Sequence, residues 1–140
     1  MKSLLVKLGV VILIGLAIFG YAEVWGADWK LYGSSENYYG YYDAQSITRT
    51  SKNIVRVWLR SNLTETGVTD AAGKLGKEFE NVNYFIILRE INCAEKKSQR
   101  LSMTYYDNKG RVIHSEGSPG GWEFIVPESM FDLLYKEVCK

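Results

Sequence analysis

Apolar and polar residues alternate along several stretches of the chain, as they do in strands with one buried face. The clearest stretch is 53–63, NIVRVWLRSNL. Its alternation places Val55, Val57 and Leu59 on one face and Arg56, Trp58 and Arg60 on the other. Residues 84–93, YFIILREINC, form a more continuous apolar run, which predicts a buried strand.

Two further stretches predict hairpins. Residues 28–49 contain two aromatic-rich runs on either side of a glycine-serine turn at 33–35, and aromatic residues favour strands. Residues 99–115 surround the sequence Asp107-Asn108-Lys109-Gly110, which places a glycine where a turn needs a positive φ.

Helical spacing appears near the C-terminus. The apolar residues Phe131, Leu134, Tyr135 and Val138 follow the i, i+3, i+4, i+7 pattern of one helical face, and Pro127 stands where such a helix would begin. A second, shorter helix is expected at 71–79 with Asp70 as its cap, although its interior glycines lower its helix propensity.

The first 22 residues have the pattern of a secretory signal peptide. Lys2 and Lys7 precede an apolar run at 8–19, and small residues precede a cleavage point after Ala22. An uncleaved membrane anchor is the alternative, but the run is shorter than the roughly 20 residues that span a bilayer. We expect one domain at 23–140, exported to the periplasm, the outer surface or the medium, with no transmembrane segment after cleavage.

Charge and cysteine content narrow the function classes. The chain has 17 Lys and Arg and 16 Asp and Glu, so removal of Lys2 and Lys7 leaves 15 basic residues and a formal net charge of −1. Such a chain lacks the basic field that favours nucleic-acid binding. The two cysteines of an exported protein, Cys93 and Cys139, are most simply paired in a disulfide, with a redox pair or a metal site as alternatives.

The cysteine positions relate the helix to the sheet. Cys139 lies beside the apolar helix face, one turn after Tyr135, and Cys93 shares its strand parity with the apolar residues Phe85, Ile87 and Ile91. A bridge would therefore tie the terminal helix to one sheet face. The expected fold class is α+β.

An ordered set of motifs resembles a known family. The set comprises W-x-L-Y at 29–32, YYDAQSITR, VRVWLR, EINC followed by QRLS, YYDNKG, GWEFIVPES and a terminal VC. Together they are similar to the surface-adhesin protein E family of exported bacterial proteins, over nearly all of the mature chain.

The resemblance implies an antiparallel sheet of about six strands, with a C-terminal helix held across its concave face by the disulfide. It also implies a dimer that binds host extracellular-matrix proteins. Members with adhesin roles are lipid-anchored, whereas the cysteines here are Cys93 and Cys139, so no lipid anchor is expected.

No catalytic motif stands out. The single histidine, His114, has no obvious partner, and Ser118 lacks the glycine two residues before it that a nucleophile elbow requires. Tyr38, Tyr39, Tyr41 and Tyr42 offer a stacking platform for glycans or haem-like ligands, but strand tyrosines more often serve packing. We expect no enzyme activity, no cofactor and no metal.

The face opposite the helix is the expected interface. Alternation places Arg56, Trp58, Arg60, Arg100 and Tyr106 there, and Trp, Tyr and Arg often carry interface energy. A self-contained surface ladder of arginines stacked on the indole is the alternative. One helix is too narrow to cover six strands, so the rest is covered either by the glycine-containing helix near Asp70 or by a second subunit; a homodimer is the preferred expectation. The predicted function is binding of a protein or cell-surface ligand; the alternative is a periplasmic structural subunit that acts by self-assembly.

Overall fold

The computed structural model describes residues 26–140, so the predicted leader at 1–22 lies outside the described residues. The elements in chain order are β1 (Trp29–Ser34), β2 (Tyr38–Asp43), β3 (Thr48–Ser51), β4 (Ile54–Leu63), α2 (Glu65–Leu75), the 3-10 turn η1 (Lys77–Phe79), β5 (Val82–Asn92), β6 (Lys97–Asp107), β7 (Val112–Glu116), β8 (Glu123–Phe124) and α3 (Met130–Val138).

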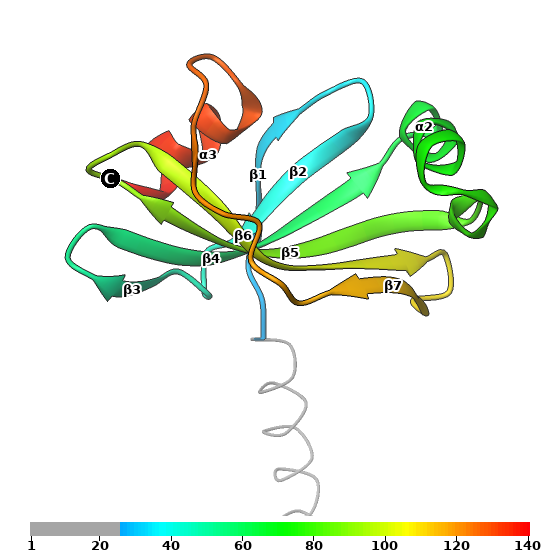
Figure 1. The fold of residues 1–140 in the computed structure, drawn as a ribbon, viewed down its shortest axis with the longest axis horizontal. Helices are drawn as coiled ribbons and strands as arrows, with labels where there is room; N and C mark the ends of the chain where they lie inside the picture. Colours follow the sequence, from blue (N-terminus) through cyan, green and yellow to red (C-terminus); the bar gives the residue numbers. More distant parts are fainter. Residues whose placement is uncertain (1–25) are drawn as a thin grey trace, which may run out of the picture.

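The strands form one antiparallel sheet of order β1-β2-β4-β5-β6-β7 (Figure 1). The short strands β3 and β8 extend it by pairing with β4 and β6. Both helices lie on the same side of the sheet, α3 near one end of the strands and α2 near the other. The predicted α+β fold is confirmed.

The core lies between the sheet and α3. Val55, Val57 and Leu59 of β4 are at most 1% exposed, and they pack in one cluster with Ile91 of β5 and Leu134 of α3. The alternation predicted for β4 is therefore confirmed, because its odd-numbered residues face the helix. Burial of such side chains stabilises a fold by roughly 1.5–3 kcal/mol each.

A disulfide ties α3 to the sheet. Cys93 and Cys139 are bonded, with their Cα atoms 5.6 Å apart, which confirms the predicted bridge. The Tyr135 hydroxyl donates a hydrogen bond to the Cys93 carbonyl oxygen at 2.9 Å. The last turn of α3 is therefore held by one covalent bond and one hydrogen bond to the same residue of the sheet.

The beginning of α3 is held by Asp132, which is 3% exposed. Its carboxylate accepts a hydrogen bond from the Glu128 backbone N–H at 2.8 Å and pairs with Lys96 at 2.9 Å. These partners lower the Asp132 pKa to about 2, with the backbone hydrogen bond as the largest cause. Glu128 has φ +65°, an unfavourable region for a non-glycine residue, and the bond to Asp132 helps to hold it there.

Helix α2 begins earlier than predicted. Its cap is Thr64, whose hydroxyl accepts from the Gly67 N–H at 3.1 Å, so the expectation of a helix from 71 capped by Asp70 was wrong at that end. Thr64 also bonds the carbonyl oxygens of Glu36 and Asn37, so the helix starts where β4 meets the β1–β2 turn. These long-range contacts are invisible to local propensity.

The predicted β6–β7 turn is confirmed. Gly110 has φ +75°, and Asp107 accepts hydrogen bonds from the backbone N–H groups of Lys109 and Arg111. No helix within residues 26–140 combines the length and apolar character that crossing a bilayer requires.

Candidate binding surfaces

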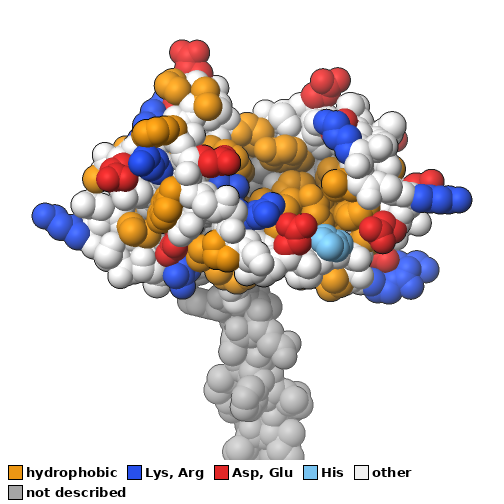
Figure 2. Space-filling view, viewed as in Figure 1, with side chains coloured by type: hydrophobic (Ala, Val, Ile, Leu, Met, Phe, Trp, Pro, Cys, Tyr) orange, Lys and Arg blue, Asp and Glu red, His pale blue; other side chains and the backbone are white. Residues whose placement is uncertain are grey.

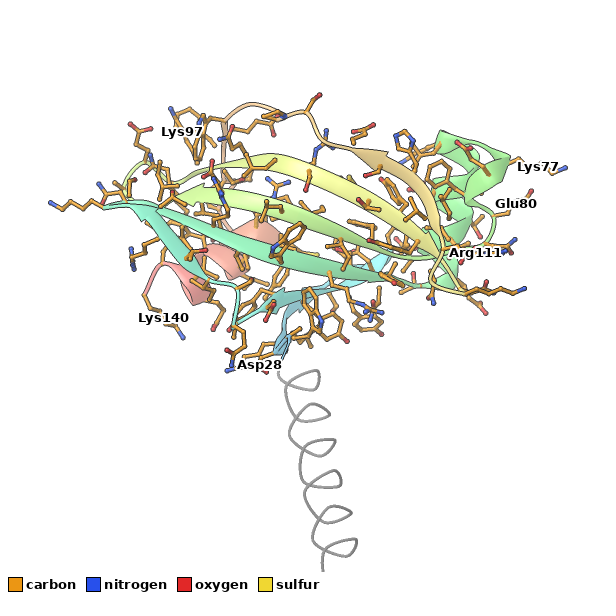
Figure 3. The ribbon with its side chains drawn as sticks, turned by 90° about the horizontal axis from the view of Figure 1, so that it is seen from below. Asp28, Lys77, Glu80, Lys97, Arg111 and Lys140 are labelled. Atoms are coloured by element: carbon orange, nitrogen blue, oxygen red, sulfur yellow. A yellow bond between two sulfur atoms is a disulfide. The ribbon has the colours of Figure 1, made fainter. Side chains whose placement is uncertain are left out.

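The side of the sheet that carries no helix, here called the open face, presents aromatic and arginine side chains. Figure 3 looks onto it from below, with the strands in front of the two helices. The strand register places on it Tyr39 and Tyr41 of β2, Arg56, Trp58 and Arg60 of β4, Tyr84, Ile86 and Leu88 of β5, and Ser102, Thr104 and Tyr106 of β6.

One end of the open face is internally neutralised. Arg56 pairs with Glu90 at 3.0 Å, and Gln99 donates to the other oxygen of the same carboxylate at 2.9 Å. Glu90 is only 9% exposed, so its negative charge is satisfied within the domain. Arg56 is therefore less available to a partner than the sequence pattern suggests.

The other end of the open face is an aromatic ladder. Tyr84 and Tyr106 stack with ring centroids 4.8 Å apart, and the Arg60 guanidinium lies 3.9 Å from the Tyr84 ring centroid. Arg60 also donates to the Asn62 side-chain oxygen at 2.8 Å. Trp58, next to this ladder, is 39% exposed. The ladder is a fixed platform with an exposed indole beside it.

Arg100 does not belong to the open face, so its predicted grouping with Trp58 was wrong. Leu88 pairs with Ser102 whereas Arg89 pairs with Arg100, which leaves Leu101 unpaired as a β-bulge. A bulge inserts one residue and reverses the side of every residue beyond it. Arg100 consequently points to the helix side, where it contacts Met103 and Glu116.

The bulge places Arg100 in a hollow between α2 and α3, here called the helix-side groove. Figure 2 shows apolar side chains gathered in this hollow between two raised parts of the surface, which correspond in Figure 1 to the loop that leads into α3 and to α2. Three adjoining pockets of about 320, 190 and 210 Å³ make up the groove. Their linings include Tyr38, Leu75, Phe79, Phe85, Arg89, Arg100, Met103, Tyr105, His114, Glu116, Gly120, Gly121 and Glu123.

The apolar half of the groove is built on aromatic contacts. Tyr105 packs edge-on against Phe79, with ring centroids 5.1 Å apart, and tilts against Phe85 at 5.3 Å. Burial raises the pKa of both Tyr38 and Tyr105, so both phenols stay protonated at neutral pH. This half therefore presents uncharged aromatic surface.

The polar half contains Arg89, which interrupts the apolar parity of β5. Its guanidinium lies 4.2 Å from the Phe131 ring centroid and donates to the Ser98 hydroxyl at 2.9 Å. Among the described residues, no carboxylate oxygen lies within 4.0 Å of it. Burial lowers the Arg89 pKa, because desolvation disfavours the charged form.

His114 has a partner that the sequence did not reveal. Its Nε2 lies 3.2 Å from a Glu116 oxygen, and Glu116 also pairs with Arg100 at 3.2 Å. Nearly half of each His114 and Glu116 side chain is exposed. The trio forms a surface ion cluster on the rim of the groove.

The tyrosines of β2 are divided between the two sides of the sheet. Tyr38 lines the groove and Tyr42 is buried in the core, whereas Tyr39 and Tyr41 pair across the open face with Asn62 and Arg60. They do not form one platform. The hypothesis of a single tyrosine stacking site for a planar ligand is therefore wrong.

Residues 29–140 match the family model of the surface-adhesin protein E. The chain belongs to the surface-adhesin protein E family. The resemblance noted from the motifs is thus confirmed. Comparison with curated proteins gave no match.

The fold recurs in crystal structures of protein E from Haemophilus influenzae. Crystal form II is 14% identical, with a TM-score of 0.54, and the alignment covers 76% of this chain and 90% of that one. Protein E from a non-typeable strain is also 14% identical, with a TM-score of 0.50, covering 79% of this chain and 74% of that one. At this identity the likeness shows a shared fold.

The helix-side groove is the surface that sequence reasoning missed. One signal was present, since Arg89 interrupts an otherwise apolar face of β5. The bulge at Leu101, which places Arg100 opposite Arg89, could not be predicted, because no glycine or proline marks its position in the sequence.

Proposed function

We propose that this protein is a non-enzymatic, exported binding domain that recognises a protein or cell-surface ligand through the open face of its sheet. Membership of the surface-adhesin family supports an adhesin-like role. The disulfide supports export, because such bonds persist in oxidising compartments.

The observation that carries the proposal is the exposed indole of Trp58 beside the stack of Arg60, Tyr84 and Tyr106. Trp, Tyr and Arg dominate the energetically important positions of protein interfaces. The side chains of Arg60, Tyr84 and Tyr106 are already ordered by their mutual contacts, so they would lose little conformational entropy when a partner binds.

The test is binding of the purified protein to immobilised extracellular-matrix proteins, measured by surface plasmon resonance. Trp58→Ala is expected to weaken binding at least tenfold, because central aromatic residues contribute about 2 kcal/mol or more. Leu133→Ala is the control, since Leu133 is 44% exposed against 39% for Trp58 and lies on α3, on the other side of the sheet. An equal loss of affinity in the two variants would rule out the open face as the binding surface.

Self-association through the same face is the second proposal. Leu31 and Tyr39, on β1 and β2 at one side of the open face, are 57% and 49% exposed, and an isologous dimer would cover them. Sedimentation at high concentration tests it, with Leu31→Lys expected to shift a dimer to monomer. A wild-type protein that remains monomeric would exclude the dimer.

Protease treatment of whole cells separates display from periplasmic residence. Digestion of the protein on intact cells supports surface adhesion. Protection until the outer membrane is permeabilised supports the alternative, a periplasmic accessory or structural subunit.

A further inference from the structure

The helix-side groove contains two arginines at directly paired positions of neighbouring strands. Arg89 of β5 and Arg100 of β6 are register partners and point to the same side. Like charges placed opposite each other in a sheet are destabilising. The pair therefore needs either carboxylates within the domain or a negatively charged ligand.

The domain supplies only part of that negative charge. Glu116 pairs with Arg100, and Glu123 lines the same pocket as both arginines without coming within 4.0 Å of either. Both glutamates are exposed, so solvent weakens their effect. Arg89, the more enclosed cation, has only the Phe131 ring and the Ser98 hydroxyl as partners among the described residues.

Both guanidinium groups keep unused hydrogen-bond donors. The Nε atoms of Arg89 and Arg100 are buried without an acceptor in the described structure. Within residues 26–140, Arg89 donates one hydrogen bond, through Nη1, so its Nη2 is left for a ligand. A planar guanidinium with free donors matches the two oxygens of a carboxylate.

Two glycines form part of the pocket wall beside the guanidinium groups. Gly120 and Gly121 line it beside Arg89 and Arg100, and neither presents a side chain. Gly121 has φ +85°, a conformation that other residues rarely adopt, so a side chain there would be strained. The wall is thus kept small next to the cationic pair.

The groove continues from the arginines onto apolar surface. Arg100 and Met103 line the adjoining pocket together with Phe79 and Tyr105. The distance from residue 100 to residue 105 along an extended strand is about 16 Å. A ligand lying along β6 would meet cationic donors at one end and aromatic surface at the other.

We propose that the helix-side groove binds an amphipathic carboxylate, with its carboxylate on Arg89 and Arg100 and its apolar body over Met103, Phe79 and Tyr105. A singly charged head fits better than a phosphate, because Glu116 and Glu123 would repel a second negative charge. The same chemistry is offered by a fatty acid or by an apolar peptide with a free C-terminus. The site is separate from the open face and does not depend on its function.

The test uses decanoate, decan-1-ol and decyl phosphate at concentrations below micelle formation, with isothermal titration calorimetry of the purified full chain. Decanoate is expected to bind at least tenfold more tightly than decan-1-ol, because a charge-assisted hydrogen bond adds about that factor. Arg89→Gln should remove this preference. Arg49→Gln, which removes the same charge from an exposed strand, is the matched control and should retain it.

Nuclear magnetic resonance of the wild-type protein makes the result independent of whether Arg89→Gln folds. Decanoate should shift the side-chain N–H signals of Arg89 and Arg100 and the Met103 methyl signal, and decan-1-ol only the methyl signal. Equal affinities for decanoate and decan-1-ol, tighter binding of decyl phosphate, or no binding at all would overturn the proposal.

Peptides distinguish the two sources of the carboxylate. An apolar hexapeptide with a free C-terminus is compared with its C-terminal amide and with decanoate. A preference for the free peptide over decanoate assigns the site to a protein terminus, and the reverse preference assigns it to a fatty acid. Binding of the amide as tightly as the free peptide would contradict a carboxylate site.

Discussion

The two helices on the same side of the sheet are held in different ways. Helix α3 places the fully buried Leu134 in the core and is tied by Cys139 to Cys93, the residue that follows β5. Helix α2 leaves Leu75 49% exposed and is attached mainly at its first turn, where Thr64 and Gly67 meet the β1–β2 turn. One helix closes the core, and the other forms a wall of the groove.

This difference shows that one helix can cover the core of a sheet while another only shapes its surface. An apolar helix face with a covalent tether contributes to global stability. A helix attached at one end contributes a boundary to a hollow, and such an element can open locally without unfolding the domain. The difference can be tested by matched changes in the two helices.

The largest expected effect comes from removing the tether. Replacing both Cys93 and Cys139 with alanine should lower the free energy of unfolding by roughly 4 kcal/mol, because the bridge closes a loop of 46 residues. Urea denaturation of the variant and of the oxidised wild type measures it. Reduction of the wild type should reproduce the loss, and an unchanged midpoint would show that α3 does not depend on the bridge.

The same leucine-to-alanine change in each helix should have unequal effects. Leu134→Ala should cost about 3 kcal/mol, because it leaves a cavity in the core. Leu75→Ala should stay within about 0.5 kcal/mol, because that side chain is half exposed. Thermal unfolding of the two variants gives the comparison. Similar losses of stability in the two variants would mean that Leu75 contributes to the packed core as much as Leu134 does.

Removal of each N-cap should separate global from local stability. Ser129 accepts from the Asp132 N–H, and Thr64 accepts from the Gly67 N–H. Ser129→Ala should lower the global free energy of unfolding by about 1 kcal/mol. Thr64→Ala should instead speed hydrogen exchange within α2 and leave β5 protected. Faster exchange throughout the sheet in Thr64→Ala would contradict a separable α2.

The smallest expected effect is confined to acid. The Asp132 pKa of about 2 lies below the ordinary value of 3.8, so its contribution to stability is present above pH 3.8 and is lost as the pH falls toward 2. Asp132→Asn should remove most of the fall in melting temperature that the wild type shows across this pH window. Asp70→Asn is the counterpart in α2, where the pair with Lys74 is exposed, and should leave the profile steep. Matching profiles in the two variants would argue against this role of Asp132.

Much of the sheet could be predicted from the sequence because its strands alternate cleanly. The apolar set of β4, the Gly110 turn and the amphipathic face of α3 each follow from local spacing, and the cysteine pair follows from the expected export. The start of α2 could not be predicted, since Thr64 is selected as the cap by distant carbonyl groups of the β1–β2 turn.

The candidate surfaces were less accessible to prediction. Trp58 and Arg60 were placed on the correct side because β4 has no irregularity next to β5. Arg100 was misplaced because alternation was extended through Leu101, which has no partner in β5. The sequence shows that Arg89 interrupts an apolar strand face. This arginine indicates a binding site only once Arg100 is known to face the same side of the sheet.

The unpaired Leu101 also bears on how such domains diverge. Deleting this one residue would restore a regular register in which Ser102 still opposes Leu88 and Arg100 still opposes Arg89, so Arg100 would stay on the helix side. A relative that is one residue shorter here would keep the same cation in its groove, and simple alternation along its sequence would predict that placement correctly. Gap placement within β6 therefore decides which arginines are truly equivalent when members of the family are aligned.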